Sequence, residues 1–268
     1  MRKLIRWVFS LIDIHLIDSD LFRLLSNNHK IIQIAKIIES SNNLDLNQYI
    51  LSNLLNSKSQ LLQDLFAHYF NDCREQGFFV EIGAADGITN SNTYLLEHDY
   101  NYTGILVEPA KVHHKKLSGT RKSIIEVSAI WSESNKTVEF LECNEVELST
   151  IRKYKKSDHH SKEREDGKVY EVPTITLIDL LAKYSAPRNI SYLSMDTEGS
   201  ELDILKDFDF SKYIFNFITI EHNFSTNRNE LSEILSRNGY KKVFEEFSFW
   251  DDFFIHNSIL VNKKLNNN

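Results

Sequence analysis

The 268-residue sequence has few of the residues that mark disulfide-rich, low-complexity or basic proteins. It contains two cysteines, three prolines and eight glycines. Two cysteines cannot build a disulfide framework, so we expect a protein of the reducing cytoplasm. With 38 acidic and 31 basic side chains the net charge is −7, which gives no electrostatic basis for binding nucleic acid. The 41% hydrophobic content is enough for a full globular core.

The sequence also lacks an apolar stretch long enough to span a bilayer, so we expect no transmembrane segment. Residues 1–25 begin like a signal peptide, with Arg2 and Lys3 ahead of a short apolar run. Asp13 interrupts that run, and no cleavage motif of small residues follows it. We interpret this segment as an amphipathic helix packed on the protein. A weak peripheral membrane contact, made by the basic segment around Trp7, is the alternative.

Apolar residues at helical spacing run through the first part of the chain, where no residues are arranged for chemistry. The spacing predicts helices near 31–38, 50–55 and 61–66. From residue 77 onward strands and helices alternate, as in an α/β fold. We therefore predict a helical extension over 1–76 and an α/β domain over 77–268. The extension would cover the domain, line an acceptor pocket or form a homo-oligomer contact.

The most informative stretch is 78–96, FFVEIGAADGITNSNTYLL, which predicts a strand, a tight loop and a helix. Small residues let the loop backbone approach a ligand, and the helix N-terminus offers free N–H groups. A dinucleotide-binding loop would need the glycines of G-x-G-x-x-G and no carboxylate at the strand end. Here Glu81 would repel a pyrophosphate and would suit a ligand with an amino group and a sulfonium centre. The alternative is a strand, turn and helix that bind no ligand.

The next two predicted strands also end in residues that could bind a nucleoside. The first ends in Glu108 and Pro109, about 25 residues beyond the small-residue loop. A carboxylate accepts two hydrogen bonds at once, which suits the two hydroxyls of a ribose. The second ends at Ser128 and Ala129, a weaker candidate for the surroundings of a base.

Two later strands end in polar residues that could form a functional site. One runs into the stretch DTEGSE (196–201), and three carboxylates so close together are costly unless cations or dipoles offset them. The next ends in Glu221, His222 and Asn223. Capping of a helix N-terminus would explain one or two of the acids, and a single histidine is usually structural. Their joint position at the ends of neighbouring strands favours a site.

Residues 144–170 form the most polar segment. Its cationic residues are Arg152, Lys153, Lys155, Lys156, His159, His160, Lys162 and Arg164. A solvated loop is one interpretation. The other is a lid whose cations bind an anionic acceptor, such as a nucleotide-linked or phosphorylated sugar.

Taken together, the chain resembles the FkbM-type methyltransferases, a branch of the class I enzymes that use S-adenosylmethionine. The motifs behind the resemblance are VEIGAADGITNSNTYLLE (80–97), GILVEP (104–109), SMDTEGSELDIL (194–205) and ITIEHN (218–223). The resemblance covers roughly 77–262. It implies an α/β fold with a Rossmann-like seven-stranded methyltransferase sheet and helices on both faces. It also implies methyl transfer to a hydroxyl oxygen of a small-molecule or glycan acceptor, as in cell-surface glycan or natural-product biosynthesis.

Further strands are expected within this fold. They lie at 137–141, 169–177, 240–249 and 257–261. The first would form a hairpin through 134–136. The last two would be the closing antiparallel hairpin of a methyltransferase sheet. Thr176 is expected to cap a helix over 178–183.

The resemblance also implies a binding site for S-adenosylmethionine. By position in the motifs, the cofactor-binding residues are Glu81, Gly83, Ala84, Asp86, Gly87, Asn92, Glu108, Pro109, Ser128, Ala129 and Asp196. The residues of the first loop would line the methionine end, Glu108 would bind the ribose, and Ser128 with Ala129 would lie near the adenine. Ala85 stands where the wider superfamily often has a glycine, which narrows the loop without excluding the cofactor.

A sugar hydroxyl must lose its proton during the transfer, and two routes fit the sequence. In one, His222 is the general base, assisted by Glu221 or Asp196. In the other, Asp196 and Glu221, together with His222 or Asn223, bind a divalent metal ion, Mg²⁺ or Mn²⁺, that acidifies the hydroxyl. Two other classes of protein compete with this hypothesis. One is a nucleotide-dependent oxidoreductase on a similar sheet, and the other is a non-catalytic S-adenosylmethionine-binding scaffold in glycan synthesis.

Overall fold

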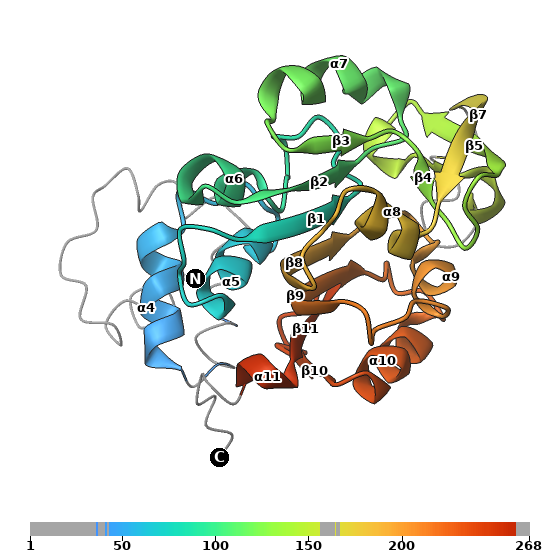
Figure 1. Ribbon diagram of the computed structural model, residues 1–268. Coiled ribbons are helices and arrows are strands. Elements are labelled where there is room, and N and C mark those ends of the chain that lie inside the picture. Colours follow the sequence, from blue (N-terminus) through green and yellow to red (C-terminus); the bar gives the residue numbers. More distant parts are fainter. Residues whose placement is uncertain (1–35, 37–40, 42, 156–163, 165–166, 261–268) are drawn as a thin grey trace.

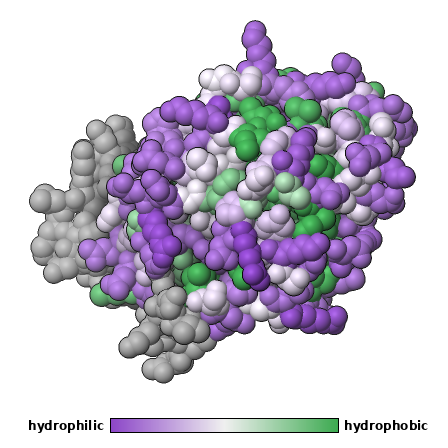
Figure 2. Space-filling view, viewed as in Figure 1, coloured by the Kyte–Doolittle hydropathy of each residue, from purple (hydrophilic) through white to green (hydrophobic). Residues whose placement is uncertain are grey.

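The computed structural model describes residues 36, 41, 43–155, 164 and 167–260. The helix predicted near 31–38 and the basic segment 1–25 therefore lie outside the described residues. Within the described part of the chain, no helix is both long and apolar enough to cross a membrane. The face shown in Figure 2 is largely hydrophilic, with hydrophobic residues in small groups.

A seven-stranded sheet forms the centre of the molecule, in the order β10-β11-β9-β8-β1-β2-β3 (Figure 1). Neighbouring strands are parallel except for β11, which runs antiparallel to both β9 and β10. The strands are β1 (Phe78–Ile82), β2 (Thr103–Val107), β3 (Ile124–Glu126), β8 (Asn189–Met195), β9 (Ile214–Glu221), β10 (Tyr240–Val243) and β11 (Asp251–His256). This topology confirms the predicted methyltransferase sheet.

The central strands are mostly apolar because both faces of the sheet are covered. Successive side chains point to opposite faces, so Phe79 packs into one core and Val80 into the other. On β8, Tyr192 packs into the same core as Phe79, and Leu193 packs into the same core as Val80.

Helices from the two halves of the chain cover opposite faces of the sheet (Figure 1). The first face is covered by α4 (Leu44–Asn53), α5 (Gln63–Phe70), α6 (Tyr94–Tyr100) and α7 (Lys111–Thr120). The second face is covered by α8 (Leu177–Lys183), α9 (Glu201–Leu205) and α10 (Arg228–Arg237). Phe66 of α5 packs against Phe217 and Phe253 of the sheet, so the described part of the N-terminal segment belongs to the same core.

A small second sheet lies beside the main one, in the order β4-β7-β5-β6. Its strands are β4 (Ala129–Ile130), β5 (Thr137–Cys143), β6 (Thr150–Ile151) and β7 (Gly167–Ile175), with 3-10 turns η1 (Val146–Leu148) and η2 (Arg152–Tyr154). The hairpin predicted through 134–136 is wrong, because β5 pairs along its whole length with β7. Long-range pairing of this kind leaves no local signal in the sequence.

Of the last two predicted strands, the one at 240–249 is present as β10 and pairs antiparallel as expected, whereas the one at 257–261 is wrong. The closing antiparallel strand is Asp251–His256, and residues 257–260 form the short helix α11 (Asn257–Leu260). Phe253 and Ile255 pack on one face of the sheet and Phe254 on the other, whereas no residue of α11 is buried. Burial on both faces therefore selects 251–256 as the strand.

Candidate active site

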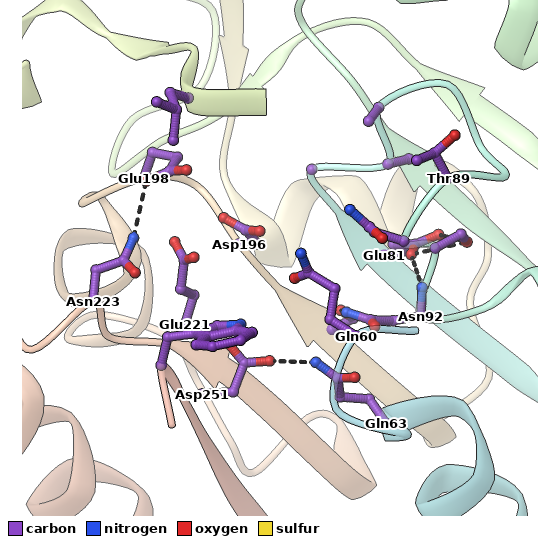
Figure 3. Close-up of a pocket in the computed structure, with 18 of the residues that line it drawn as sticks. Gln60, Gln63, Glu81, Thr89, Asn92, Asp196, Glu198, Glu221, Asn223 and Asp251 are labelled. Carbon is purple, nitrogen blue, oxygen red and sulfur yellow. Dashed lines mark hydrogen bonds between the residues drawn. The ribbon is translucent and has the colours of Figure 1, made fainter. Parts of the chain in front are cut away.

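The carboxyl ends of β1, β2, β8 and β9 meet at one edge of the sheet, where the structure has two adjoining pockets. The acidic pocket is lined by Gln60, Gln63, Glu81, Gly83, Ala84, Ala85, Thr89, Asn90, Ser91, Asn92, Leu148, Ser194, Asp196, Glu198, Glu221, Asn223, Phe224, Trp250 and Asp251 (Figure 3). The apolar pocket is lined by Ile82, Gly83, Val107, Glu108, Pro109, Ala129, Ile130, Phe140, Ser149, Ile151, Asp196, Thr197, Glu198 and Ser200. The two pockets share Gly83, Asp196 and Glu198.

Gly83 stands at the junction of the two pockets and cannot be replaced by a larger residue. Its φ of +88° lies in the left-handed region, and an added Cβ would come 2.2 Å from the carbonyl oxygen of Asp196. The N–H groups of Gly83 and Ala84 both donate to the Val107 carbonyl, at 3.0 and 3.1 Å. The loop after β1 is therefore held tightly between the ends of β2 and β8.

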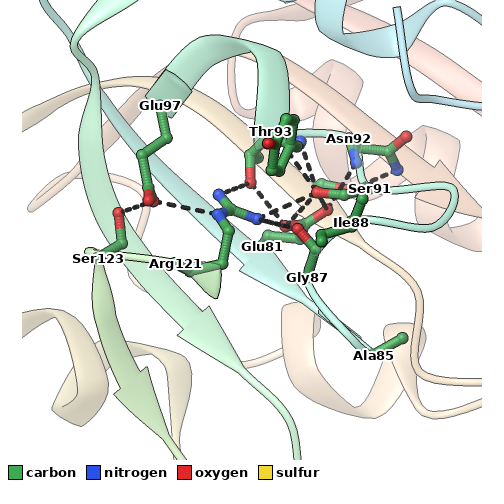
Figure 4. Close-up of polar contacts among 12 residues, drawn as sticks. Glu81, Ala85, Gly87, Ile88, Ser91, Asn92, Thr93, Glu97, Arg121 and Ser123 are labelled. Carbon is green, nitrogen blue, oxygen red and sulfur yellow. Dashed lines mark hydrogen bonds and ion pairs between the residues drawn. The ribbon is translucent and has the colours of Figure 1, made fainter. Parts of the chain in front are cut away.

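The Glu81 carboxylate accepts hydrogen bonds from the segment that follows β1 (Figure 4). It accepts hydrogen bonds from the Asn92 N–H at 2.7 Å and from the Thr93 hydroxyl at 2.6 Å. Burial raises the pKa of Glu81, although the nearby charge of Arg121 acts in the opposite direction. Glu81 lines the acidic pocket, but its hydrogen bonds mainly fix the loop.

Arg121, directly after α7, completes this network (Figure 4). Its guanidinium donates to the Gly87 carbonyl at 3.1 Å and to the Thr93 hydroxyl at 2.8 Å. It also lies 3.2 Å from the Glu97 carboxylate. One buried cation thus joins α7 to the loop and to α6. Nothing in the sequence indicated this role, because Arg121 lies outside every motif.

Asp86 stabilises the turn of the loop and does not line either pocket. Its carboxylate accepts from the N–H groups of Ile88 and Thr89 at 2.8 and 2.7 Å. The Lys116 ammonium lies 2.6 Å away. Burial opposes its charge, but these donors outweigh it and hold the pKa of Asp86 well below its usual range. Gly87 also lies outside both pockets, and its φ of +80° closes the turn against α7.

Glu108 lines the apolar pocket, where the sequence predicted a ribose-binding carboxylate. It accepts from the Ala85 N–H at 2.7 Å and from the Ala110 N–H at 2.6 Å. Burial raises the pKa of Glu108 to about 7, and the two backbone donors counteract the rise. Pro109 and Ala129 lie beside it in the same pocket. Ser128 does not line the pocket, and its N–H donates to Glu126 at 2.8 Å.

Three carboxylates converge in the acidic pocket. Asp196, Glu198 and Glu221 offer oxygen atoms within 4.8 Å of one another, so together they could hold a cation. Burial raises the pKa of Glu221 well above its usual value, and the charge of Asp196 raises it further. Glu221 is therefore a carboxyl group that binds a proton readily.

The charge of Glu198 is offset by an arginine from a distant part of the chain. The buried guanidinium of Arg164 lies 2.6 Å from its carboxylate, and the Asn223 amide donates to the same oxygen at 3.1 Å. Glu198 stood in the acidic motif but had no predicted role. Arg164 was predicted to be a lid cation, whereas its side chain is 0% exposed and paired within the protein.

His222 does not join the carboxylates, contrary to its predicted position as base or metal ligand. Its Nε2 lies 3.3 Å from the Ser248 hydroxyl and 3.6 Å from Asp252, and its Nδ1 accepts from the Phe224 N–H. Burial lowers the pKa of His222 to about 4, although the charge of Asp252 favours the protonated form. Glu221 and its neighbour His222 point to different sides of the chain.

The N-terminal segment contributes residues that the motifs did not indicate. Gln60 and Gln63 line the acidic pocket, and Gln63 donates to Asp251 at 2.6 Å. Burial raises the pKa of Asp251 to about 7. Trp250 precedes it on the same side of the pocket. These residues lie far from the motifs in sequence, so only the fold brings them to the site.

Comparison with known proteins identifies the domain. A family model described as the Methyltransferase FkbM domain matches residues 81–258. No curated protein matches the chain. Gln60 and Gln63 lie outside the matched residues.

Two solved structures match parts of the chain. One is a methyltransferase FkbM from Methylobacillus flagellatus KT, with a TM-score of 0.40, 12% identity and coverage of 84% of this chain. The chain spans 58% of the length of that protein. The other is a fibrillarin/Nop5p complex, with a TM-score of 0.35 and 12% identity, covering 68% of this chain and 73% of the matched one.

Proposed function

The chain belongs to the FkbM methyltransferase family. We propose that it transfers the methyl group of S-adenosylmethionine to a hydroxyl oxygen of an acceptor. The acceptor would be a sugar, in a cell-surface glycan precursor or a natural product. The observation that supports the proposal is the junction of two unlike pockets at Gly83 and Asp196. One has the surface for a nucleoside, and the other has carboxylates able to accept a proton.

The residues of both pockets fit S-adenosylmethionine. Pro109, Ala129 and Phe140 offer apolar surface to an adenine, and Glu108 offers carboxylate oxygens to the ribose. In the acidic pocket the buried Oδ1 of Asn92 has no hydrogen-bond partner among the described residues. A buried amide oxygen needs a donor, and the ammonium group of the cofactor would supply one.

When bound, the cofactor supplies a methyl group on a sulfonium, which is open to in-line displacement. The protein must then position the acceptor hydroxyl and receive its proton. Asp196 and Glu221 are the best-placed residues, because Asp196 borders both pockets and Glu221 lies beside it. The raised pKa of Glu221 makes this pair a better general base near neutral pH. We assign His222 a structural role, since it is held by Ser248 and the Phe224 backbone.

A divalent metal ion is the second route to the same proton transfer. Asp196, Glu198 and Glu221 would be its oxygen ligands, and such ligands suit Mg²⁺ or Mn²⁺. The Arg164 guanidinium already offsets the charge of Glu198 at 2.6 Å. We therefore favour the metal-free route.

Calorimetric titration with S-adenosylmethionine and S-adenosylhomocysteine tests the proposed function. We expect micromolar binding by the wild type and its loss in Glu108→Ala. The control Glu139→Ala removes an exposed carboxylate on β5, paired with Arg152 at 2.9 Å, and should bind normally. Absence of binding by the wild type would refute the proposal. Binding without turnover on any acceptor would instead favour the non-catalytic scaffold.

A further inference from the structure

We propose that Gln60 and Phe224 form the acceptor subsite of the acidic pocket, and that this subsite selects an uncharged carbohydrate ring. The inference rests on the proposed function and specifies its acceptor. It combines three independent features of the pocket, namely the Gln60 amide, an exposed aromatic ring and the local charge.

The backbone that carries Gln60 is held in place by contacts of the neighbouring residues. Asp64 accepts hydrogen bonds from the hydroxyls of Ser57 and Ser59, at 2.6 and 2.7 Å. Ser59 also forms a β-bridge with Asn90 of the loop after β1. Figure 3 shows the Gln60 side chain projecting into the pocket toward Asp196. A side-chain amide both donates and accepts hydrogen bonds, which is what adjacent sugar hydroxyls require.

Phe224 is the exposed aromatic ring at this pocket. It follows β9 in a turn where Asn223 and Phe224 have φ angles of +39° and +57°. A bulky residue in the left-handed region is an outlier, and such strain clusters at functional sites. The side chain is 68% exposed although it is large and apolar. The His222 ring lies edge-on to it at 5.4 Å, and His222 accepts from its N–H. An aromatic face held in this way suits the apolar C–H face of a sugar ring.

The charge of the pocket excludes an anionic ring. Its described lining residues include five carboxylic acids and no lysine, arginine or histidine. A phosphate or uronate at the reacting ring would meet Asp196 and Glu221 without a cation to pair with. Three described cations of the predicted lid pair within the protein: Arg152 with Glu139, Lys153 with Asp203 and Arg164 with Glu198. These pairs weaken the interpretation in which the cations of 144–170 bind an anionic acceptor.

Ligand-observed NMR tests the subsite without any cofactor. Saturation transfer is measured for methyl glucoside, methyl galactoside and methyl rhamnoside, and for glucuronic acid, glucose 6-phosphate and glucosamine. We expect at least one neutral glycoside to bind, and the two anionic sugars to bind at least tenfold more weakly. Gln60→Ala and Phe224→Ala should each weaken the neutral sugar about three- to tenfold, the effect of losing one hydrogen bond or one stacking contact. Phe224→Tyr keeps the ring and should restore binding.

Two controls match these variants. Lys58→Ala changes an exposed neighbour of Gln60 outside the pocket, and Leu44→Ala removes an apolar side chain that is 67% exposed, close to the value for Phe224. Both should bind sugars normally. Preference for an anionic or amino sugar, no binding of any neutral sugar, or unchanged affinity in both Gln60→Ala and Phe224→Ala would overturn the inference. The calorimetric titration with S-adenosylmethionine is separate, so its failure would refute the proposed function alone.

Discussion

The guanidinium of Arg121 lies 3.5 Å from the carboxylate of Glu81, with 1% and 3% of the two side chains exposed. This ion pair joins the end of α7 to β1 directly beneath the loop that borders both pockets. Glu81 therefore has a structural partner, and the sequence had suggested only a ligand for it. Burying two charges is favourable only when both are paired and hydrogen-bonded, a condition that the surrounding hydroxyls meet.

The pair makes a prediction about stability. Arg121→Met should lower the free energy of unfolding by about 3–5 kcal/mol, because it leaves the Glu81 carboxylate buried and unpaired. The double variant Glu81→Gln/Arg121→Met should recover part of that loss. Lys116→Met removes a half-exposed ion pair with Asp86 and should cost no more than about 1 kcal/mol. Urea denaturation measures all three, and a loss below about 1 kcal/mol in Arg121→Met would contradict this role.

Affinity for S-adenosylmethionine should depend on the ionisation of Glu108. Its pKa is raised to about 7, so the carboxylate that we propose as the ribose acceptor is lost as the pH falls through 7. Between pH 8 and pH 6 we expect the affinity to fall about tenfold. Calorimetry at both values measures it. Glu108→Gln should bind S-adenosylmethionine weakly at both pH values. Because ionisation of the ligand itself affects the wild type and the variant equally, the variant serves as the control. An equal change of affinity between pH 8 and pH 6 in the wild type and in Glu108→Gln would contradict the prediction.

Proton removal should depend on Glu221 and not on His222. Glu221→Gln should lower kcat about 10²- to 10⁴-fold, the usual contribution of a general base, with a smaller effect on the affinity for S-adenosylmethionine. His222→Gln should retain most of the activity. Transfer of a labelled methyl group to a neutral sugar provides the assay. A larger loss in His222→Gln than in Glu221→Gln would restore the histidine as base.

Chelation distinguishes the two catalytic routes. We expect activity to survive dialysis against EDTA, because the Arg164 guanidinium already offsets the charge of Glu198, one of the three carboxylates. Loss of activity that Mg²⁺ or Mn²⁺ restores would establish the metal route, with Asp196, Glu198 and Glu221 as the ligands to mutate next.

His222 should also make stability depend on pH. Its pKa is about 4 in the folded state and about 6.5 when unfolded, so the unfolded chain binds the extra proton between these values. Stability is thus lost as the pH falls, by roughly 2 kcal/mol between pH 7 and pH 5 from this group. Glu108 and Asp251 have raised pKa values and act in the opposite direction. The readout is therefore the difference in urea denaturation between wild type and His222→Gln, in which those effects cancel. No difference would contradict the buried, neutral state of His222.

The class of fold and the edge of the sheet where the site lies can be predicted from the sequence. Strands buried on both faces are mostly apolar, and this pattern is visible locally at 78–82 and 190–195, interrupted by Glu81 and by two serines. The residues that follow such strands collect at the carboxyl edge of the sheet. The positions of Gly83, Glu108 and Asp196 at that edge therefore follow from the order of residues along the chain.

Which of two neighbouring side chains faces the site depends on packing between elements that are distant in sequence. Glu221 and His222 are adjacent, and the pleat of β9 together with Asp252 on β11 directs the histidine away. Arg121, Arg164 and Gln60 come from distant parts of the chain. The sequence around each of them does not indicate which residues it contacts. Long-range packing brings these charges and amides to the pocket, and it thereby determines which side chains a ligand would contact.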